Sequence, residues 1–323
     1  MKKLKALPKK YRLAMTGVLL LALFVFPALN LSQYVYRICV ISVLYAILAM
    51  SLNLIAGVAG QISLGHIAFY GIGAYTSALL CVNFGVSVWL SILAAFVVSM
   101  FFGLLIAIPT LKLSGGYLAI LTMSFAEIIR LILLNWTSVT RGPMGILNIP
   151  KPQLFGYTIK SSAAFLYLVL IIAIIVYVSL NNLIKSKFGR NLKALRDDEI
   201  SSESMGIDVY RHKVVAFVIS TGIAGIAGAL YASYMEFIDP SSFISDESTV
   251  ILSMVVLGGM GNMNGSIVAA VLLTVLPEAL RSFSNYRMLV YGVVLVVMML
   301  LKITDWSAAK RALKTVTTFK KER

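Results

Sequence analysis

The segment from residue 185 to residue 213 combines charged and apolar side chains in a pattern that suits binding to a partner protein. It holds seven bases and five acids, interleaved with Leu192, Leu195, Ile200 and Met205. A short helix with an apolar face and charged flanks can dock in a groove of another protein. The alternative is a solvated loop whose charges cancel one another. The chemistry indicated here is recognition rather than catalysis.

Local residue types suggest how a helix in this segment would end. Gly206 can adopt the left-handed conformation that stops a helix. Asp208 can then accept hydrogen bonds from the free N–H groups of the next helix. We therefore expect one short helix over about residues 190–206, followed by a capped, longer helix.

Motifs typical of enzymes are missing from the sequence. It contains neither a Gly-x-x-x-x-Gly-Lys-[Ser/Thr] phosphate-binding loop nor a Gly-x-Ser-x-Gly nucleophile elbow. His66 and His212 are far apart, and neither has a Cys or carboxylate at the spacing of a metal site. We expect a protein that is not an enzyme, has no catalytic residues, binds no metal and uses no cofactor of its own.

Two groups of residues lie where glycines interrupt apolar runs. Glycine allows helices to approach closely, and broken helices line substrate pathways in transporters. Taken alone, His66 is better explained as a polar residue at a helix start near the membrane interface. As a group, the candidates for a translocation pathway are Ser63, Gly65, His66, Gly258, Gly259 and Gly261.

Glu127 and Arg130 are the ionisable pair inside another apolar run. Ionisable groups within a membrane are costly and are therefore candidates for function. Their i, i+3 spacing places them on one helix face, where they can pair. Because polar residues begin at Asn135, we favour a structural pair near the outer interface.

The composition identifies the class of protein. Of the 323 residues, 59% are hydrophobic and 13% are charged, whereas soluble domains have about 45–50% and about 25%. Lys and Arg number 28 against 13 Asp and Glu, which in a membrane protein reflects inside-facing loops and anionic lipid rather than nucleic acid. We predict an all-α, polytopic transmembrane helical bundle that forms a single transmembrane domain over residues 1–323.

Apolar runs long enough to cross a bilayer recur along the chain. A crossing needs about 20 residues, and breakers such as Pro109 and Gly115 separate the runs. The runs lie at about 13–29, 37–56, 66–84, 86–109, 116–134, 163–184, 213–235, 249–276 and 286–302.

The distribution of bases predicts the orientation. Loops rich in Lys and Arg stay in the cytoplasm, which places both basic tails, 1–13 and 302–323, and segment 185–213 inside. Segment 236–247 has four acids and no base and is expected outside. Two inside tails need an even number of crossings, so we expect the glycine-rich run 249–276 to enter and return. About eight crossings then remain. Alternatively, Gly57 to Gly65 could be the re-entrant stretch, or a different division of the apolar runs would give ten crossings.

Three stretches together resemble a known family. The first comprises Phe188-Gly189-Arg190, Ala194-Leu195-Arg196-Asp197-Asp198-Glu199, Met205-Gly206-Ile207 and Lys213 to Phe217. The second is Gly60-Gln61-Ile62-Ser63-Leu64-Gly65-His66, continuing through Ala68-Phe69 to Gly73-Ala74-Tyr75. The third is Leu257-Gly258-Gly259-Met260-Gly261-Asn262 with Gly265. The first resembles the cytoplasmic loop of ABC importer permeases. All three resemble the LivM-type permease of branched-chain amino acid importers, over roughly residues 35–300. Ser201, Ser202 and Ser204 depart from the alanines that this family often has.

The resemblance implies a role and a set of partners. The loop would form the coupling helix that docks on the ATPase subunit, with Gly189, Arg190, Arg196, Asp197, Asp198, Glu199 and Gly206 as its characteristic residues. A second homologous permease subunit, two ABC ATPase subunits, which use the ATP, and a periplasmic or extracellular solute-binding protein would complete an importer in the bacterial inner membrane, surrounded by lipid. A permease of the same superfamily for urea, short amides or a sugar is the alternative. A secondary transporter is a second alternative, which the polar inner loop disfavours.

Overall fold

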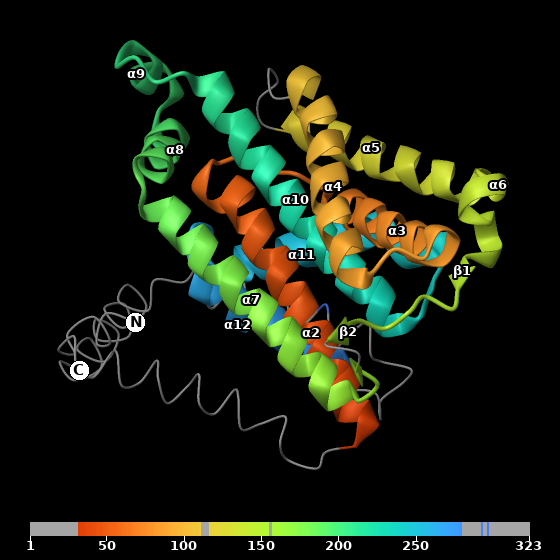
Figure 1. The fold of residues 1–323 in the computed structure, drawn as a ribbon. Helices are drawn as coiled ribbons and strands as arrows, with labels where there is room; N and C mark the ends of the chain where they lie inside the picture. Colours follow the sequence, from red (N-terminus) through yellow and green to blue (C-terminus); the bar gives the residue numbers. More distant parts are fainter. Residues whose placement is uncertain (1–31, 111–115, 155–156, 280–291, 293–295, 297–323) are drawn as a thin grey trace, which may run out of the picture.

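The computed structural model describes residues 32–110, 116–154 and 157–279, together with residues 292 and 296. Both predicted basic tails, 1–13 and 302–323, lie outside these ranges, and so does the apolar run 13–29. Of the apolar run 286–302, only residues 292 and 296 are described. The described chain forms a bundle of helices with a few two-residue strands (Figure 1).

Within the described residues, six helical segments are long and apolar enough to cross a membrane. They coincide with six of the apolar runs, so the prediction of an all-α, polytopic membrane protein is confirmed. In the first of them, an α-helix continues directly into a π-helical turn, η3. The segments are α2 (Gln33–Leu52) with η3 (Asn53–Val58), α3 (His66–Phe84), α4 (Val88–Thr110), α5 (Gly116–Asn135), α7 (Ser162–Lys185) and α10 (Val209–Met235).

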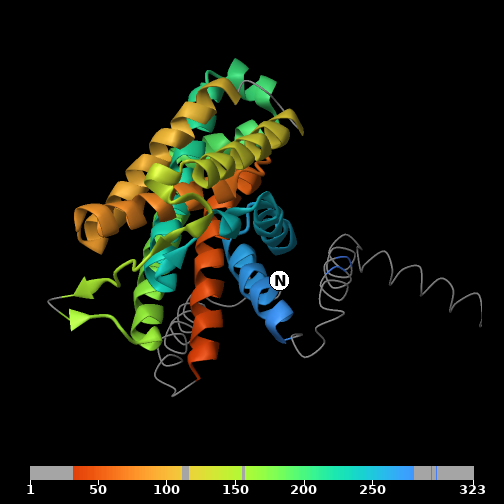
Figure 2. The same ribbon diagram turned by 90° about the vertical axis from the view of Figure 1, so that its right-hand side faces the viewer.

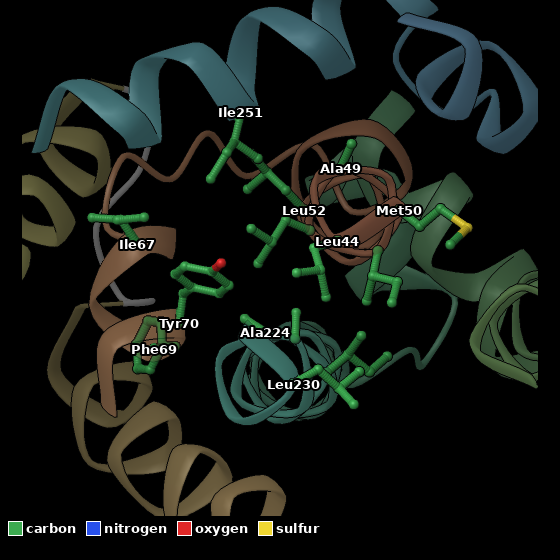
Figure 3. Close-up of a cluster of buried hydrophobic side chains, with 14 of the residues drawn as sticks. Leu44, Ala49, Met50, Leu52, Ile67, Phe69, Tyr70, Ala224, Leu230 and Ile251 are labelled. Carbon is green, nitrogen blue, oxygen red and sulfur yellow. The ribbon is translucent and has the colours of Figure 1, made fainter. Parts of the chain in front are cut away.

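Helices α2 and α10 form the centre of the bundle. Their side chains interlock with those of α3 and α11 in a core that includes Leu44, Tyr70, Leu230 and Ile251 (Figure 3). Helix α10 packs so closely on α3 that a Cβ on Gly73 would overlap the backbone of Gly225. Such small-residue contacts are typical of helix packing in lipid.

Helix α4 lies at the edge of the bundle and exposes an apolar stripe. The exposed side chains recur every three or four residues and therefore share one face of the helix. A surface of this kind is expected against lipid or another membrane subunit rather than water. Its residues include Leu90, Leu93, Val97, Phe101, Leu104 and Ile108.

Run 249–276 is divided into two helices, α11 (Ser245–Gly258) and α12 (Met263–Ala279). Three contacts with successive levels of α2 show their path. Glu247 of α11 accepts a hydrogen bond from Tyr45 (2.7 Å), the turn reaches Asn53, and Glu278 of α12 is hydrogen-bonded to Tyr34. The chain thus advances along α2 and returns, with α12 beside it (Figure 2, blue beside red).

The division of this run into two helices that enter and return is confirmed, and their re-entrance into the membrane stays a prediction. Helix α11 has 14 residues and rises about 21 Å, which is too short for a bilayer core of about 30 Å. The total of eight crossings stays a prediction, because two of the expected spans are not described.

The two polar ends of the bundle are separated by the length of α10. Helices α8 (Lys187–Asp197) and α9 (Glu199–Ser204) precede α10 at one end. At the other end, β4 (Phe237–Ile238) pairs antiparallel with β1 (Ile146–Leu147), followed by η5 (Pro240–Phe243). Nearby are α6 (Thr137–Thr140), η4 (Gly142–Met144) and the hairpin β2 (Gln153–Leu154) and β3 (Tyr157–Thr158). Segments 185–213 and 236–247 therefore lie at opposite ends, as expected.

Candidate functional site

Helix α8 is held against the permease itself. The hydroxyl of Ser186 caps its first turn by accepting a hydrogen bond from the Gly189 N–H (3.4 Å). A Cβ on Gly189 would overlap the backbone of Ile184, so the helix starts in direct contact with the end of α7. Leu192 and Leu195 are buried. Part of the apolar face expected to meet a partner is thus already covered.

The expectation of one helix over residues 190–206 is wrong, because the helix is interrupted at Asp198. Asp198 has extended backbone angles, and its carboxylate accepts a hydrogen bond from the Ser201 N–H (2.9 Å) as the cap of α9. Aspartate favours this capping role over a helix interior. Hydrogen bonds from the Ser201 backbone and hydroxyl hold the pKa of Asp198 below its usual value.

Helix α9 carries the exposed half of the divided apolar face. Ile200 is 79% exposed and Met205 is 83% exposed. Gly206 ends the helix with φ of +81°, and Asp208 caps α10 by accepting from the Arg211 N–H (2.9 Å). Both of these local predictions are confirmed.

An ion pair fixes α9 on the central helix α10. Lys213 Nζ lies 2.6 Å from a carboxylate oxygen of Glu199, and Lys213 is only 8% exposed. In the sequence, Lys213 is one base of the loop and begins the stretch Lys213 to Phe217 that shares the family resemblance. Nothing in the local pattern marks it as the partner of a residue 14 positions earlier.

Two charged residues of the predicted coupling segment, Arg190 and Asp197, make local contacts. Arg190 donates to the carbonyl of Lys185 (3.0 Å), and Asp197 pairs with its neighbour Arg196 (3.2 Å). Both Arg190 and Asp197 are exposed. They are therefore accessible to a partner subunit without being anchored in the bundle.

Arg196 reaches from α8 to the membrane-spanning helices. Its guanidinium donates a hydrogen bond to the carbonyl of Gly57 in η3 (2.7 Å). Its aliphatic stem runs past Gly60, where an added Cβ would lie 2.6 Å from Arg196 Cγ. Gly60 has a positive φ of +74°, a conformation that glycine adopts readily.

The same point of η3 meets the turn between α11 and α12. Asn53 is buried, and its side-chain oxygen accepts a hydrogen bond from the Gly261 N–H (2.8 Å). A Cβ on Gly57 would overlap the Gly261 nitrogen. Arg196, Gly57, Asn53 and Gly261 thus join the loop helix, the π-helical turn and the re-entrant pair. We call these four residues the arginine junction.

Glycines shape the re-entrant turn next to this junction. Gly259 and Gly261 have φ values of +99° and +79°. A Cβ on Gly258 would overlap the backbone of Ser266, which brings the ends of α11 and α12 together. These glycines are candidates already from the sequence, whereas Asn53 is not among them, although its polar side chain within an apolar run was the available signal.

Ser63, Gly65 and His66 lie apart from the junction, at the start of α3. His66 is the first residue of α3, as expected of a helix-start residue; it is buried, and its Nε2 lies 2.7 Å from the Ser51 hydroxyl. Its Nδ1 has no hydrogen-bond partner among the described residues. Ser63 is buried too, and a Cβ on Gly65 would overlap the carbonyl of Thr122. Glycines let the chain turn into the bundle here, which places His66 in the core.

The predicted pairing of Glu127 and Arg130 on α5 is confirmed, with a shortest nitrogen to oxygen distance of 2.5 Å. The Ser245 hydroxyl lies 3.4 Å from Glu127. Because Ser245 begins α11, the pair lies toward the end of the bundle opposite α8 and α9, in line with a structural role.

Comparison with known proteins identifies the family. Residues 34–300 match the family described as branched-chain amino acid transport system, permease component. The chain belongs to this permease family. It is 41% identical over 286 residues to the high-affinity branched-chain amino acid transport system permease protein LivM of Salmonella typhimurium, covering 81% of this chain and 67% of that protein. No solved structure matches the chain.

Two further relatives of this permease come from Escherichia coli. Its LivM protein is 40% identical over 306 residues, which cover 88% of this chain and 72% of the relative. Its high-affinity branched-chain amino acid transport system permease protein LivH is 25% identical over 257 residues, which cover 74% of this chain and 82% of that protein.

Proposed function

We propose that this permease forms half of the translocation pathway of an ATP-driven importer for branched-chain amino acids. The observation that carries the proposal is its identity of 40–41% with two LivM proteins over most of its length. The weaker similarity to LivH suggests a homologous second permease subunit as the partner. Two ATPase subunits hydrolyse ATP, and an external solute-binding protein delivers the substrate.

The ATPase contact is proposed to lie on α9 rather than on α8. Ile200 of α9 and Met205, directly after it, are exposed to solvent, whereas Leu192 and Leu195 of α8 are buried. Beside α9 is an open hollow of about 640 Å³, whose lining includes Glu199, Glu203 and Asp208. An ATPase groove with apolar pockets and basic side chains would complement this surface. In this arrangement the α9 end faces the cytoplasm.

The arginine junction supplies a route from the ATPase to the pathway. When α8 and α9 move as a rigid body with the ATPase, Arg196 transmits the displacement to the carbonyl of Gly57. Gly57 in turn contacts Gly261 at the tip of the re-entrant pair. Packed elements shift between discrete arrangements rather than deforming continuously, so a small movement of α8 can open or close the pathway beside Gly261.

Transport by a reconstituted complex tests the proposal. The permease is combined in liposomes with the permease, ATPase and binding proteins encoded by neighbouring genes, and uptake of radiolabelled leucine is measured. We expect uptake that requires both ATP and the binding protein. The purified permease alone should hydrolyse no ATP, because its sequence has no phosphate-binding loop. Leucine uptake by the lone chain, driven by a proton or sodium gradient, would instead identify a secondary transporter.

A further inference from the structure

Aromatic side chains gather at the end of the bundle opposite α8 and α9. Phe243, from the 3-10 turn η5, is only 2% exposed. Its ring centroid lies 5.6 Å from that of Tyr70, 6.0 Å from that of Tyr75 and 6.2 Å from that of Tyr231. We call the three tyrosines the tyrosine cage. Phe243, which belongs to segment 236–247, fills this cage.

The wall of the cage is shaped around the phenyl ring. Gly71 lies on α3 between Tyr70 and Tyr75, and a Cβ there would lie 3.2 Å from Phe243 Cγ. Tyr70 and Tyr231 also pack against each other, with their ring centroids 5.4 Å apart. Removing the phenyl ring would leave a space large enough for the smaller side chains of leucine, isoleucine or valine.

A carboxylate lies close to the cage. Glu247 is in the first turn of α11 and is half-buried, and it accepts a hydrogen bond from the Tyr45 hydroxyl (2.7 Å). The next residue, Ser248, accepts a hydrogen bond from the Ile67 N–H (3.1 Å), about one turn before Tyr70 on α3. Among the described residues, no Lys or Arg forms a salt bridge with Glu247. A half-buried carboxylate without a basic partner is a favourable place for a cation.

The cage also contains a polar group without a partner. Tyr75 is buried, and its hydroxyl has no hydrogen-bond partner in the described part of the chain. Leaving a buried hydroxyl unpaired costs about 1–3 kcal/mol, so such a group is usually matched by a bound molecule or by water. The hydroxyl, the aromatic faces and the carboxylate together offer a hydrogen bond, an apolar surface and a negative charge.

We propose that Phe243 plugs a transient binding site for a free amino acid, in which the apolar side chain of the ligand replaces the phenyl ring and its ammonium group pairs with Glu247. Tyrosine faces suit both parts of such a ligand, because they pack against apolar groups and attract cations. The site lies where a solute-binding protein would release its substrate, and this inference rests on the proposed transport of amino acids.

Direct binding to the complete complex without its binding protein tests the site. Removing the plug by Phe243→Ala should allow millimolar binding of leucine and of 3-methylbutylamine, which keeps the ammonium and the side chain but lacks the carboxylate. The deaminated analogue 4-methylpentanoate should bind at least about tenfold more weakly, because it cannot form the charged hydrogen bond to Glu247. Phe243→Leu, which keeps an apolar plug, serves as the control.

Neighbouring carboxylates supply a matched pair of variants. Adding Glu247→Gln to Phe243→Ala should remove the preference for the amine, whereas adding Asp246→Asn should keep it, since Asp246 is exposed on the same turn. In the otherwise unchanged importer, Glu247→Gln should lower leucine uptake at saturating binding protein at least about tenfold, and Asp246→Asn less than about twofold.

The results separate this inference from the proposed function. If the unaltered importer takes up leucine but Glu247→Gln and Asp246→Asn behave alike, the site is wrong and the function stands. Equal binding of amine and carboxylate analogues would also overturn the site. If the unaltered importer takes up no leucine, the proposed function fails, whatever the cage binds.

Discussion

Arg196 of the loop helix α8 donates a hydrogen bond of 2.7 Å to the carbonyl of Gly57, which lies 139 residues earlier in the π-helical turn η3. A carbonyl at the end of a helix has no partner within it, and here a charged side chain supplies one. Because Gly57 also contacts the Gly261 nitrogen at the re-entrant tip, a single hydrogen bond connects the polar loop with both glycine-rich breaks.

Arg196→Ala should uncouple ATP hydrolysis from transport. A hydrogen bond to a charged group contributes about 1.5–3 kcal/mol, so we expect leucine uptake per ATP hydrolysed to fall about tenfold or more. Simultaneous measurement of uptake and hydrolysis in liposomes checks this. Arg190→Ala is the control, because the guanidinium of Arg190 donates to the carbonyl of Lys185, five residues earlier, and not to η3. Equal coupling ratios in the two variants would show that the Arg196 contact transmits nothing.

Gly57→Ala should destabilise the arginine junction. The added Cβ would overlap Asn53 and the Gly261 nitrogen, and overpacking of this kind costs about 1–3 kcal/mol. Thermal unfolding of the purified permease in detergent should show a lower midpoint. Gly116→Ala is the matched control, because no heavy atom lies within 4 Å of the added carbon. A midpoint unchanged by Gly57→Ala would mean that η3 and the re-entrant turn separate readily.

The two ends of the bundle should face opposite sides of the membrane, with α9 in the cytoplasm. Segment 185–213 holds seven bases and segment 236–247 holds none, and bases favour the cytoplasmic side. In a background without Cys39 and Cys81, an impermeant maleimide applied to intact cells should label Ser241→Cys but not Ser204→Cys.

Ser204 and Ser241 are both exposed, so accessibility to the reagent does not favour either position. Permeabilised cells should give label at both. Labelling of Ser204→Cys in intact cells would reverse the orientation and, with it, the proposed sides of the ATPase and the binding protein.

Features set by local chemistry were predictable from the sequence. The spans follow from hydropathy, and the helix stop at Gly206 and the cap at Asp208 follow from the conformational preferences of those residue types. The re-entrant pair followed from combining glycine content with the charge distribution. The break at Asp198 was missed, because the apolar spacing over 190–206 is helical and only the capping preference of one aspartate interrupts it.

Contacts between distant segments were beyond the reach of sequence reasoning. Gly261 and Asn53 are 208 residues apart, and Arg196 and Gly57 are 139 residues apart. In neither pair does the sequence pattern around one residue indicate which residue is its partner. For the same reason Glu247 was taken as one acid of an external segment, although Tyr45 of α2 binds it and it lies near the tyrosine cage.

Ile200→Asp should prevent assembly with the ATPase while leaving the permease folded. The Ile200 side chain is 79% exposed, so introducing a charge there disturbs no internal packing. If Ile200 docks in an apolar pocket, the change removes about 1.5–3 kcal/mol of burial and adds the cost of desolvating a carboxylate. We expect co-purification of the ATPase to fall at least about tenfold, and ATP-driven uptake with it. Ser204→Asp introduces the same charge on the same exposed helix without removing an apolar contact, so it should retain the ATPase. Comparable losses in both variants would indicate that net charge controls assembly, and full retention in both would exclude α9 as the contact and return that role to the exposed charges of α8.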